Sequence, residues 1–191
     1  MKVLVTGGAG FIGSHLCDRL LARGDEVTIL DNFNDFYDPA IKRGNLSSLG
    51  EARLVEGDIR DAALVERVFA DGQFDGVVHL AAMAGVRPSL EDPLLYEDVN
   101  VRGTLILLEE IRKYDGLRFV FASSSSVYGG NDDVPFREAS EIQKPISPSA
   151  ATKRAGELLA YTHHHLSGLP ATGLRFFTVY GPRQRPEMAI H

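Results

Sequence analysis

The sequence has little cysteine, no excess of positive charge and no long hydrophobic run. Cys17 is the only cysteine among 191 residues, which excludes a disulfide framework and a cysteine-based zinc site. Lys and Arg number 20 against 26 Asp and Glu, so neither nucleic acid nor an anionic membrane is expected as the main partner. The first apolar run, Val3-Leu4-Val5, breaks at Thr6-Gly7-Gly8, too early for a signal peptide or a membrane span. We therefore expect a cytoplasmic protein.

The rest of the composition is that of an ordered globular protein. Hydrophobic residues make up 44% of the chain and charged residues 24%, which is enough apolar material for a proper core. The length corresponds to one ordinary domain or a little more. Disorder is therefore not expected.

Short apolar runs alternate with longer helical stretches, a pattern typical of a parallel sheet covered on both faces. Strands are predicted over 2–6, 26–31, 53–56, 76–80, 118–122 and 172–175. Helices are predicted over 11–22, 39–49, 62–69, 93–114 and 148–166. With right-handed crossovers, this order predicts an α/β fold with a doubly wound Rossmann sheet.

Three glycines at a three-residue spacing separate the first strand from the first helix. Gly7 allows a tight turn, Gly10 allows backbone to approach a pyrophosphate, and Gly13 allows close packing of helix on strand. The second strand ends in Asp31, where the adenosine ribose of a bound dinucleotide should lie. A carboxylate there accepts hydrogen bonds from ribose hydroxyls and repels a 2′-phosphate, so the pattern predicts NAD rather than NADP.

Two further runs follow predicted strands at their carboxyl ends, where open α/β sheets bind ligands. They are Gly57-Asp58-Ile59 and His79-Leu80-Ala81-Ala82. The small Ala81 and Ala82 would allow a ligand to approach closely. Asp58 is equally compatible with a cofactor contact and with a helix cap near Asp61.

The sequence resembles a known family, the extended short-chain dehydrogenase/reductases, and within it the NAD-dependent nucleotide-sugar 4-epimerases. The motifs in order are Thr6–Gly13 as TGGAGFIG, Asp31-Asn32, Gly57-Asp58-Ile59, His79-Leu80-Ala81-Ala82, Asn100–Thr104 as NVRGT, Ser123–Gly129 as SSSSVYG, Ala150–Lys153 as AATK, and Leu174-Arg175-Phe176-Phe177. The runs 32–38 and 185–189, the latter after Gly181-Pro182, are most similar to UDP-glucuronate 4-epimerases, with UDP-glucose 4-epimerases next.

The resemblance implies a hydride exchange between NAD and C4 of a UDP sugar through a 4-keto intermediate. It implies an NAD-binding domain over 1–175 and, over 176–191, the truncated start of a substrate-binding portion. The NAD contacts that it implies come from Gly7, Gly10, Phe11, Ile12, Gly13, Asp31, Asn32, Asp58, Ile59, Leu80, Ala81, Ala82, Asn100, Ala122, Lys153 and Phe176.

The catalytic positions of the family fall on Ser124, Ser149 and Lys153. The family has a tyrosine where this chain has Ser149, four residues before the lysine. An aliphatic hydroxyl is far less acidic than a phenol, so serine is not a substitute for the proton acceptor. We expect a chain that binds NAD and epimerises slowly. A non-catalytic NAD-binding fragment or variant is the alternative.

Substrate contacts are expected from Ser125, Ser126, Thr178, Arg87 and Arg185. At Ser125 and Ser126 the related dehydratases carry an Asp-Glu pair, so dehydration is disfavoured and the small serines leave room for a turning sugar. Either arginine would pair with a carboxylate or a diphosphate, and surface roles are nearly as plausible for both.

Helices over 93–114 and 148–166 carry apolar faces that fit either a core or a homodimer interface, and the resemblance implies the dimer. The run His163-His164-His165 is interpreted as a solvated helix end, because consecutive helical residues point in different directions. No metal site is therefore predicted.

Overall fold

In the computed structural model, the chain forms a parallel sheet of six strands in the order β3-β2-β1-β4-β5-β6. The structure describes residues 1–47, 49–131, 134–140, 142, 144–186 and 188. The strands are β1 (Lys2–Thr6), β2 (Glu26–Asp31), β3 (Arg53–Glu56), β4 (Gly76–His79), β5 (Arg118–Ser124) and β6 (Ala171–Phe176). The order reverses direction between β1 and β4, which confirms the predicted doubly wound sheet.

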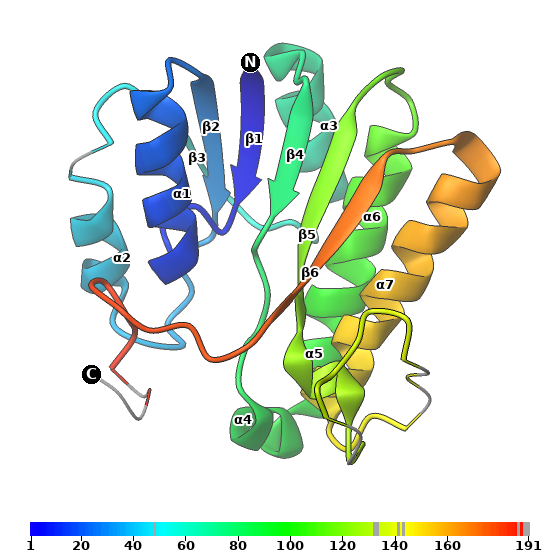
Figure 1. Cartoon of the computed structure of the whole chain (residues 1–191). Helices are drawn as coiled ribbons and strands as arrows, with labels where there is room; N and C mark the ends of the chain where they lie inside the picture. The colour runs from blue at the N-terminus through cyan, green and yellow to red at the C-terminus, as the bar shows by residue number, and fades with distance from the viewer. Residues whose placement is uncertain (48, 132–133, 141, 143, 187, 189–191) are drawn as a thin grey trace.

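Helices connect the strands and cover the sheet (Figure 1). Among the described residues they are α1 (Phe11–Ala22), α2 (Pro39–Asn45), α3 (Ala62–Gly72), α4 (Val86–Glu91), α5 (Pro93–Glu97), α6 (Gly103–Ile111) and α7 (Pro148–Ser167). None of these described helices has the length and apolar character that a membrane span needs.

The core lies on both faces of the sheet because neighbouring side chains of a strand point to opposite sides. Val3 and Val5 of β1 pack with Cys17 and Leu20 of α1. Leu4, between them, packs into the larger cluster formed with α3 and α6. The near-continuous apolar character of β1 is thus explained by burial on both sides.

The helix predicted over 93–114 differs from the observed one. After α5 the backbone widens into a π-helical turn, Asp98–Arg102, before α6 ends at Ile111. The Asp92 side chain accepts a hydrogen bond from the Leu95 backbone at 3.1 Å, which caps α5. The π turn was not predictable, because hydrophobic spacing does not report a local change in hydrogen-bond register.

Other boundaries shift by a few residues. α2 is shorter than predicted, α3 and β5 are longer, and α4 and a 3-10 turn at Ser125–Tyr128 were not predicted. Ser147 caps α7 by accepting a hydrogen bond from the Ala150 backbone at 3.1 Å, and Gly168, at φ +71, ends it.

The segment after β6 runs back below the carboxyl ends of the strands toward α1 and α2 (Figure 1). His15 on α1 contacts the Pro182 carbonyl oxygen at 2.9 Å, and Arg183 forms an ion pair with Asp18 at 2.6 Å. These contacts hold the end of the returning segment against α1.

Candidate functional site

A cavity of about 380 Å³ lies at the carboxyl ends of the strands. Its walls come from the turn after β1, the ends of β2 to β5, the start of α7 and the segment after β6. Its volume is in the usual range for cofactor and substrate sites. Position and size together make it the candidate site.

The glycine turn forms one wall by close backbone approach. Gly7 has φ +70, and a side-chain carbon added to it would lie 2.6 Å from the Ala81 nitrogen. A side-chain carbon on Gly13 would collide with the Gly7 carbonyl oxygen. Both positions therefore require glycine, and the turn leaves the start of α1 open to the cavity, where backbone N–H groups attract an anion.

Asp31 connects the end of β2 to this turn. Its carboxylate is buried, at 7% exposure, and accepts hydrogen bonds from the backbones of Ala9 at 3.1 Å and Phe33 at 3.0 Å. Asn45 on α2 donates to the Ala9 carbonyl at 3.0 Å. Asp31 is thus held in place at the cavity wall as an acceptor.

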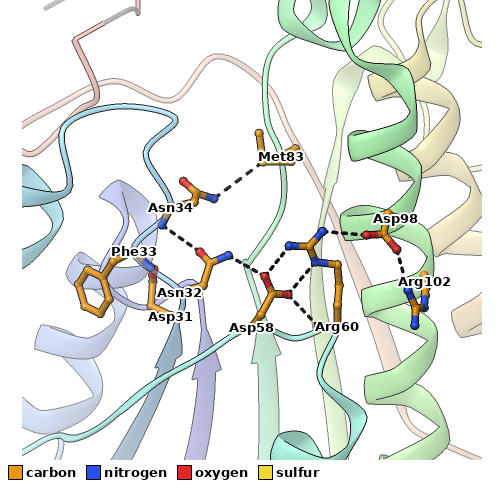
Figure 2. Close-up of polar contacts among 9 residues, drawn as sticks. All are labelled: Asp31, Asn32, Phe33, Asn34, Asp58, Arg60, Met83, Asp98 and Arg102. Carbon is orange, nitrogen blue, oxygen red and sulfur yellow. Dashed lines mark hydrogen bonds and ion pairs between the residues drawn. The ribbon is translucent and has the colours of Figure 1, made fainter.

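Asp58 lies at the same wall, within a chain of polar contacts (Figure 2). Asn32 and Arg60 both donate to its carboxylate, and Arg60 also contacts Asp98. Hydrogen bonds from Arg60, opposed by burial, lower the pKa of Asp58 to about 2. The helix cap is Asp61, which accepts from the Leu64 backbone at 3.0 Å. Of the two roles considered for Asp58, a cofactor contact and a helix cap, the cap is taken by Asp61.

Sequence reasoning missed part of the wall between β2 and α2. Asn34, Phe36, Tyr37 and Lys42 line the cavity there. Lys42 Nζ donates to the Asn34 carbonyl at 3.0 Å and to its side-chain oxygen at 2.7 Å. Burial lowers the pKa of Lys42, and the charges of Asp31 and Asp35 oppose that effect. The polar and aromatic run 32–38 was the sequence signal that could have indicated these lining residues.

Ser124, Ser149 and Lys153 come together at the other end of the cavity. Lys153 Nζ donates to the Ala122 carbonyl oxygen at 2.8 Å, and burial lowers the pKa of Lys153 to about 8. Ser124 Oγ accepts hydrogen bonds from Ser126, at 3.1 Å from its nitrogen and 2.8 Å from its hydroxyl. The arrangement places two hydroxyls and one amine at the same end of the cavity.

Comparison with known proteins now decides the family. The model of the NAD dependent epimerase/dehydratase family matches residues 3–191. The chain belongs to this family. UDP-glucuronate 4-epimerase 3 of Arabidopsis thaliana is 52% identical over 191 residues, which cover 98% of this chain and 44% of the plant protein.

Two crystal structures of family members have the same fold. UDP-glucuronic acid 4-epimerase from Bacillus cereus, in complex with UDP-glucuronic acid and NAD, is 40% identical with a TM-score of 0.91. UDP-glucose 4-epimerase from Thermus thermophilus, in complex with NAD, is 42% identical with a TM-score of 0.88. The aligned region covers 99% of this chain in both cases, and 60% and 59% of the respective solved chains.

Most of the predicted cofactor residues line the cavity of this family member. They are Gly7, Gly10, Phe11, Ile12, Gly13, Asp31, Asn32, Asp58, Ile59, Leu80, Ala81, Ala82, Ala122, Lys153 and Phe176. Asn100, also predicted as a cofactor residue, is not among the described residues that line this cavity. It is buried in the π turn, donates to Thr152 Oγ1 at 3.0 Å, and exchanges hydrogen bonds with the Met83 backbone at 2.8 and 3.0 Å. Asn100 therefore holds the loop after β4 in place.

The predicted substrate residues divide into two groups. Thr178 and Arg185 line the cavity, and the Arg185 guanidinium lies 5.3 Å from the centre of the Phe36 ring. Arg87, Ser125 and Ser126 are not among the described residues that line it. Arg87 lies on α4, and Ser125 and Ser126 lie in the 3-10 helix after β5. Of the run 185–189, Glu187 and Ala189 lie outside the described residues.

The consecutive histidines contact different partners. His163 Nε2 lies 3.1 Å from a carboxylate oxygen of Glu109, and His163 Nδ1 lies 2.9 Å from the Leu159 carbonyl. His164 Nδ1 lies 2.9 Å from the Leu169 carbonyl. The rings do not converge on one point, because successive residues of a helix point in different directions.

Proposed function

We propose that residues 1–175 are the NAD-binding part of a nucleotide-sugar 4-epimerase, with UDP-glucuronate as the favoured substrate. The observation that carries this is the continuous cavity from the glycine turn to Ser124 and Lys153. One end of the cavity lies at the start of α1, where a phosphate can bind, and the other end holds the residues for proton transfer. A dinucleotide bound beside a reacting sugar requires both.

The residues present fit NAD. The cradle at Gly7 and Gly13 leaves the space that a side chain would fill, and the start of α1 offers backbone donors to a pyrophosphate. Asp31 presents a buried carboxylate to ribose hydroxyls, and its charge opposes a 2′-phosphate. When bound, NAD supplies the acceptor and donor of hydride at C4 of the sugar.

The chain's own residues handle the proton. Ser124 Oγ, already accepting two hydrogen bonds from Ser126, donates its remaining proton to the sugar 4-oxygen. Lys153 supplies positive charge beside it. Ser149 occupies the position one helical turn before Lys153 and lacks a phenol, so removal of the 4-hydroxyl proton is slow. We therefore propose reduced turnover in this sequence.

UDP-glucuronate is favoured because the relatives of Arabidopsis and Bacillus cereus are named for it. Thr178 and Arg185, in the segment 176–191 that we assign to the start of the substrate-binding portion, line the same cavity. Arg185 is the candidate partner for the carboxylate or the diphosphate. UDP-glucose is the alternative sugar, since the Thermus thermophilus relative is named for it.

A homodimer through α5, α6 and α7 belongs to the same proposal. Leu94, Leu105, Leu158 and Tyr161 are exposed on these helices. Leu94 is 79% exposed and Tyr161 67%, whereas the opposite faces of the helices are buried in the core. A second copy of the chain would remove this apolar surface from water.

A non-catalytic NAD-binding role is the second candidate, and Ser149 favours it.

Calorimetric titration with NAD and NADP tests dinucleotide binding, which both candidate functions require. We expect NAD to bind and NADP to bind at least about tenfold more weakly, because hydrogen bonds to a charged group carry about this discrimination. The Asp31→Asn variant should narrow the difference. Failure of the chain to bind either dinucleotide would refute both candidates. Conversion of UDP-glucuronate then separates the epimerase from the binding protein.

A further inference from the structure

His79 lies at the end of β4, buried between two threonine hydroxyls that come from different elements. Thr6 ends β1, and Thr104 belongs to α6. None of the three is among the described residues that line the large cavity. We propose that His79 is a positioning residue that holds the loop after β4 against the nicotinamide half of a bound dinucleotide. The inference rests on the proposed function, because it needs bound NAD.

Both ring nitrogens of His79 are used inside the protein. Thr6 Oγ1 lies 2.7 Å from Nδ1, and Thr104 Oγ1 lies 2.9 Å from Nε2. Thr104 donates its single hydroxyl proton to the Asn100 carbonyl oxygen at 2.6 Å, so Thr104 accepts from Nε2. Nδ1 of the neutral ring then accepts from Thr6. Burial, with the charge of Lys153, lowers the pKa of His79 to about 3, which keeps the ring neutral.

Thr6 carries one side of this contact to the start of the loop. Its hydroxyl accepts a hydrogen bond from the Ala81 backbone nitrogen at 3.3 Å, and its carbonyl oxygen accepts from the Leu80 backbone at 3.0 Å. Ala81 lies so near the glycine turn that a side-chain carbon on Gly7 would be 2.6 Å from the Ala81 nitrogen. The first residues of the loop are therefore held against the glycine turn.

Thr104 carries the other side of the contact to the end of the loop. It donates to the Asn100 carbonyl, and the Asn100 amide exchanges hydrogen bonds with the Met83 backbone at 2.8 and 3.0 Å. Asn100 Nδ2 also donates to Thr152 Oγ1 on α7 at 3.0 Å. Ala81 and Met83 are thus held from opposite sides of one histidine ring. A break at either hydroxyl releases one end of the loop.

The strand order identifies the half of the dinucleotide that this loop faces (Figure 1). β4 lies between β1 and β5, whereas Asp31, which we assign to the adenosine ribose, ends β2 on the other side of β1. A dinucleotide crosses the point where the strand order reverses, so the half beyond the pyrophosphate lies over β4. Ala81, Ala82 and Met83 line the cavity there. A shift of the loop therefore affects the nicotinamide riboside and leaves the adenosine contacts in place.

The test compares the affinities of the 191-residue chain for NAD and for ADP by calorimetric titration. ADP contains the adenosine and the pyrophosphate of NAD and lacks the nicotinamide riboside. Thr104→Val keeps the shape of the side chain and removes the hydroxyl that joins His79 to Asn100. We expect NAD to bind about tenfold more weakly, the effect of about one buried hydrogen bond, and ADP to bind as before.

Three further variants serve as controls. Thr104→Ser should restore the affinity for NAD, because serine retains the hydroxyl. Thr6→Val breaks the contact on the other side of the ring and should lower the ratio of NAD affinity to ADP affinity in the same way. Thr28→Val is the matched control, because Thr28 is also buried, in the neighbouring strand β2, and lies outside these contacts. It should leave the ratio as in the unaltered chain.

The ratio of the two affinities separates positioning from a general loss of structure. If Thr104→Val weakens NAD and ADP equally, or weakens neither, the role of His79 is refuted and NAD binding stands. Failure of Thr104→Ser to restore the affinity for NAD also refutes it. No binding of NAD to the unaltered chain refutes the proposed function itself. Should Thr104→Val fail to fold by circular dichroism, Thr6→Val supplies the same comparison.

Discussion

Lys153 Nζ donates a hydrogen bond to the carbonyl oxygen of Ala122 at 2.8 Å. This bond ties the first turns of α7 to the end of β5, and it places the amine at the cavity wall. Ser149 lies one helical turn earlier, on the same face of α7. Position 149 is therefore correctly spaced from Lys153 for a proton acceptor that the lysine supports. The side chain at that position is a serine, which is not such an acceptor.

Ser149→Tyr should raise the turnover of UDP-glucuronate by about a hundredfold or more, the usual contribution of a positioned general base. The amine of Lys153, whose pKa burial lowers to about 8, would stabilise the ionised phenol. Product formation followed by chromatography measures it. Adding Lys153→Met to the same variant should remove the gain. Full activity in the unaltered chain would refute the assignment of Ser149.

Gly7→Ala should destabilise the chain and weaken NAD binding together. The residue has φ +70, and the new methyl would lie 2.6 Å from the Ala81 nitrogen. We expect a loss of at least about 2 kcal/mol in the free energy of unfolding, from backbone strain and overpacking. Gly44→Ala in α2 is the control, because no atom lies within 4 Å of the added methyl. Gly44→Ala should leave NAD binding unchanged. Urea denaturation measures the stability of the two variants, and calorimetric titration measures their NAD binding. Equal effects of the two substitutions would contradict the close approach at Gly7.

Much of the sheet and the glycine turn was predictable from local pattern. β1, β2, β3 and α1 have the predicted bounds. The buried strands β1 and β2 and the glycine-bounded start of α1 leave strong signals in a short window. Right-handed crossovers, which hold for nearly all parallel connections, fix which face of the sheet each connecting helix covers.

The polar contacts of the cavity wall were not predictable. Arg60 reaches Asp98 across 38 positions, and Asn100 reaches Thr152 across 52. Such pairs depend on how the π turn is rotated against β4 and α7, and hydrophobic spacing does not encode that rotation. The resemblance implied a cofactor contact for Asn100, and local pattern gave no sign of the hydrogen bonds that its amide makes with Met83 and Thr152.

His79 should make the chain less stable as the pH falls from 6.5 toward 3. Burial, with the charge of Lys153, lowers the pKa of His79 to about 3 in the folded chain. Thr104 donates its only proton to the Asn100 carbonyl, so His79 Nε2 carries a proton toward Thr104 and Nδ1 accepts from Thr6. The unfolded chain binds one more proton in this window, so the free energy of unfolding falls with acidification.

This contribution reaches at most about 1.4 kcal/mol per pH unit, the effect of one proton. Urea denaturation at a series of pH values between 6.5 and 4.5, above the range of most carboxyls, measures it. His79→Gln should flatten the slope, although it lowers stability at neutral pH. His165→Gln, on the exposed end of α7, should leave the slope unchanged. An unchanged slope in His79→Gln would show that another group takes up the proton.

Arg175→Met should destabilise the chain because it leaves Glu157 with fewer donors in a half-buried position. Arg175 on β6 donates to both carboxylate oxygens of Glu157 on α7, at 2.8 and 3.0 Å. Burial opposes ionisation of this carboxyl, yet hydrogen bonds from Arg175, Ser123 and Arg154 lower the pKa of Glu157. We expect a loss of about 2 kcal/mol, below the value for a fully buried pair because two donors remain.

The double variant Arg175→Met/Glu157→Gln decides whether the loss comes from the pair. Removing the charge together with its partner should cost less than the sum of the two single changes, by about 1 kcal/mol. Arg53→Met is the control for an exposed pair, since Arg53 and Asp71 are 52% and 60% exposed in their contact between β3 and α3. It should cost less than about 1 kcal/mol. Strict additivity in the double variant would mean that Arg175 acts through Tyr128 and the loop carbonyl of Glu138 rather than through Glu157.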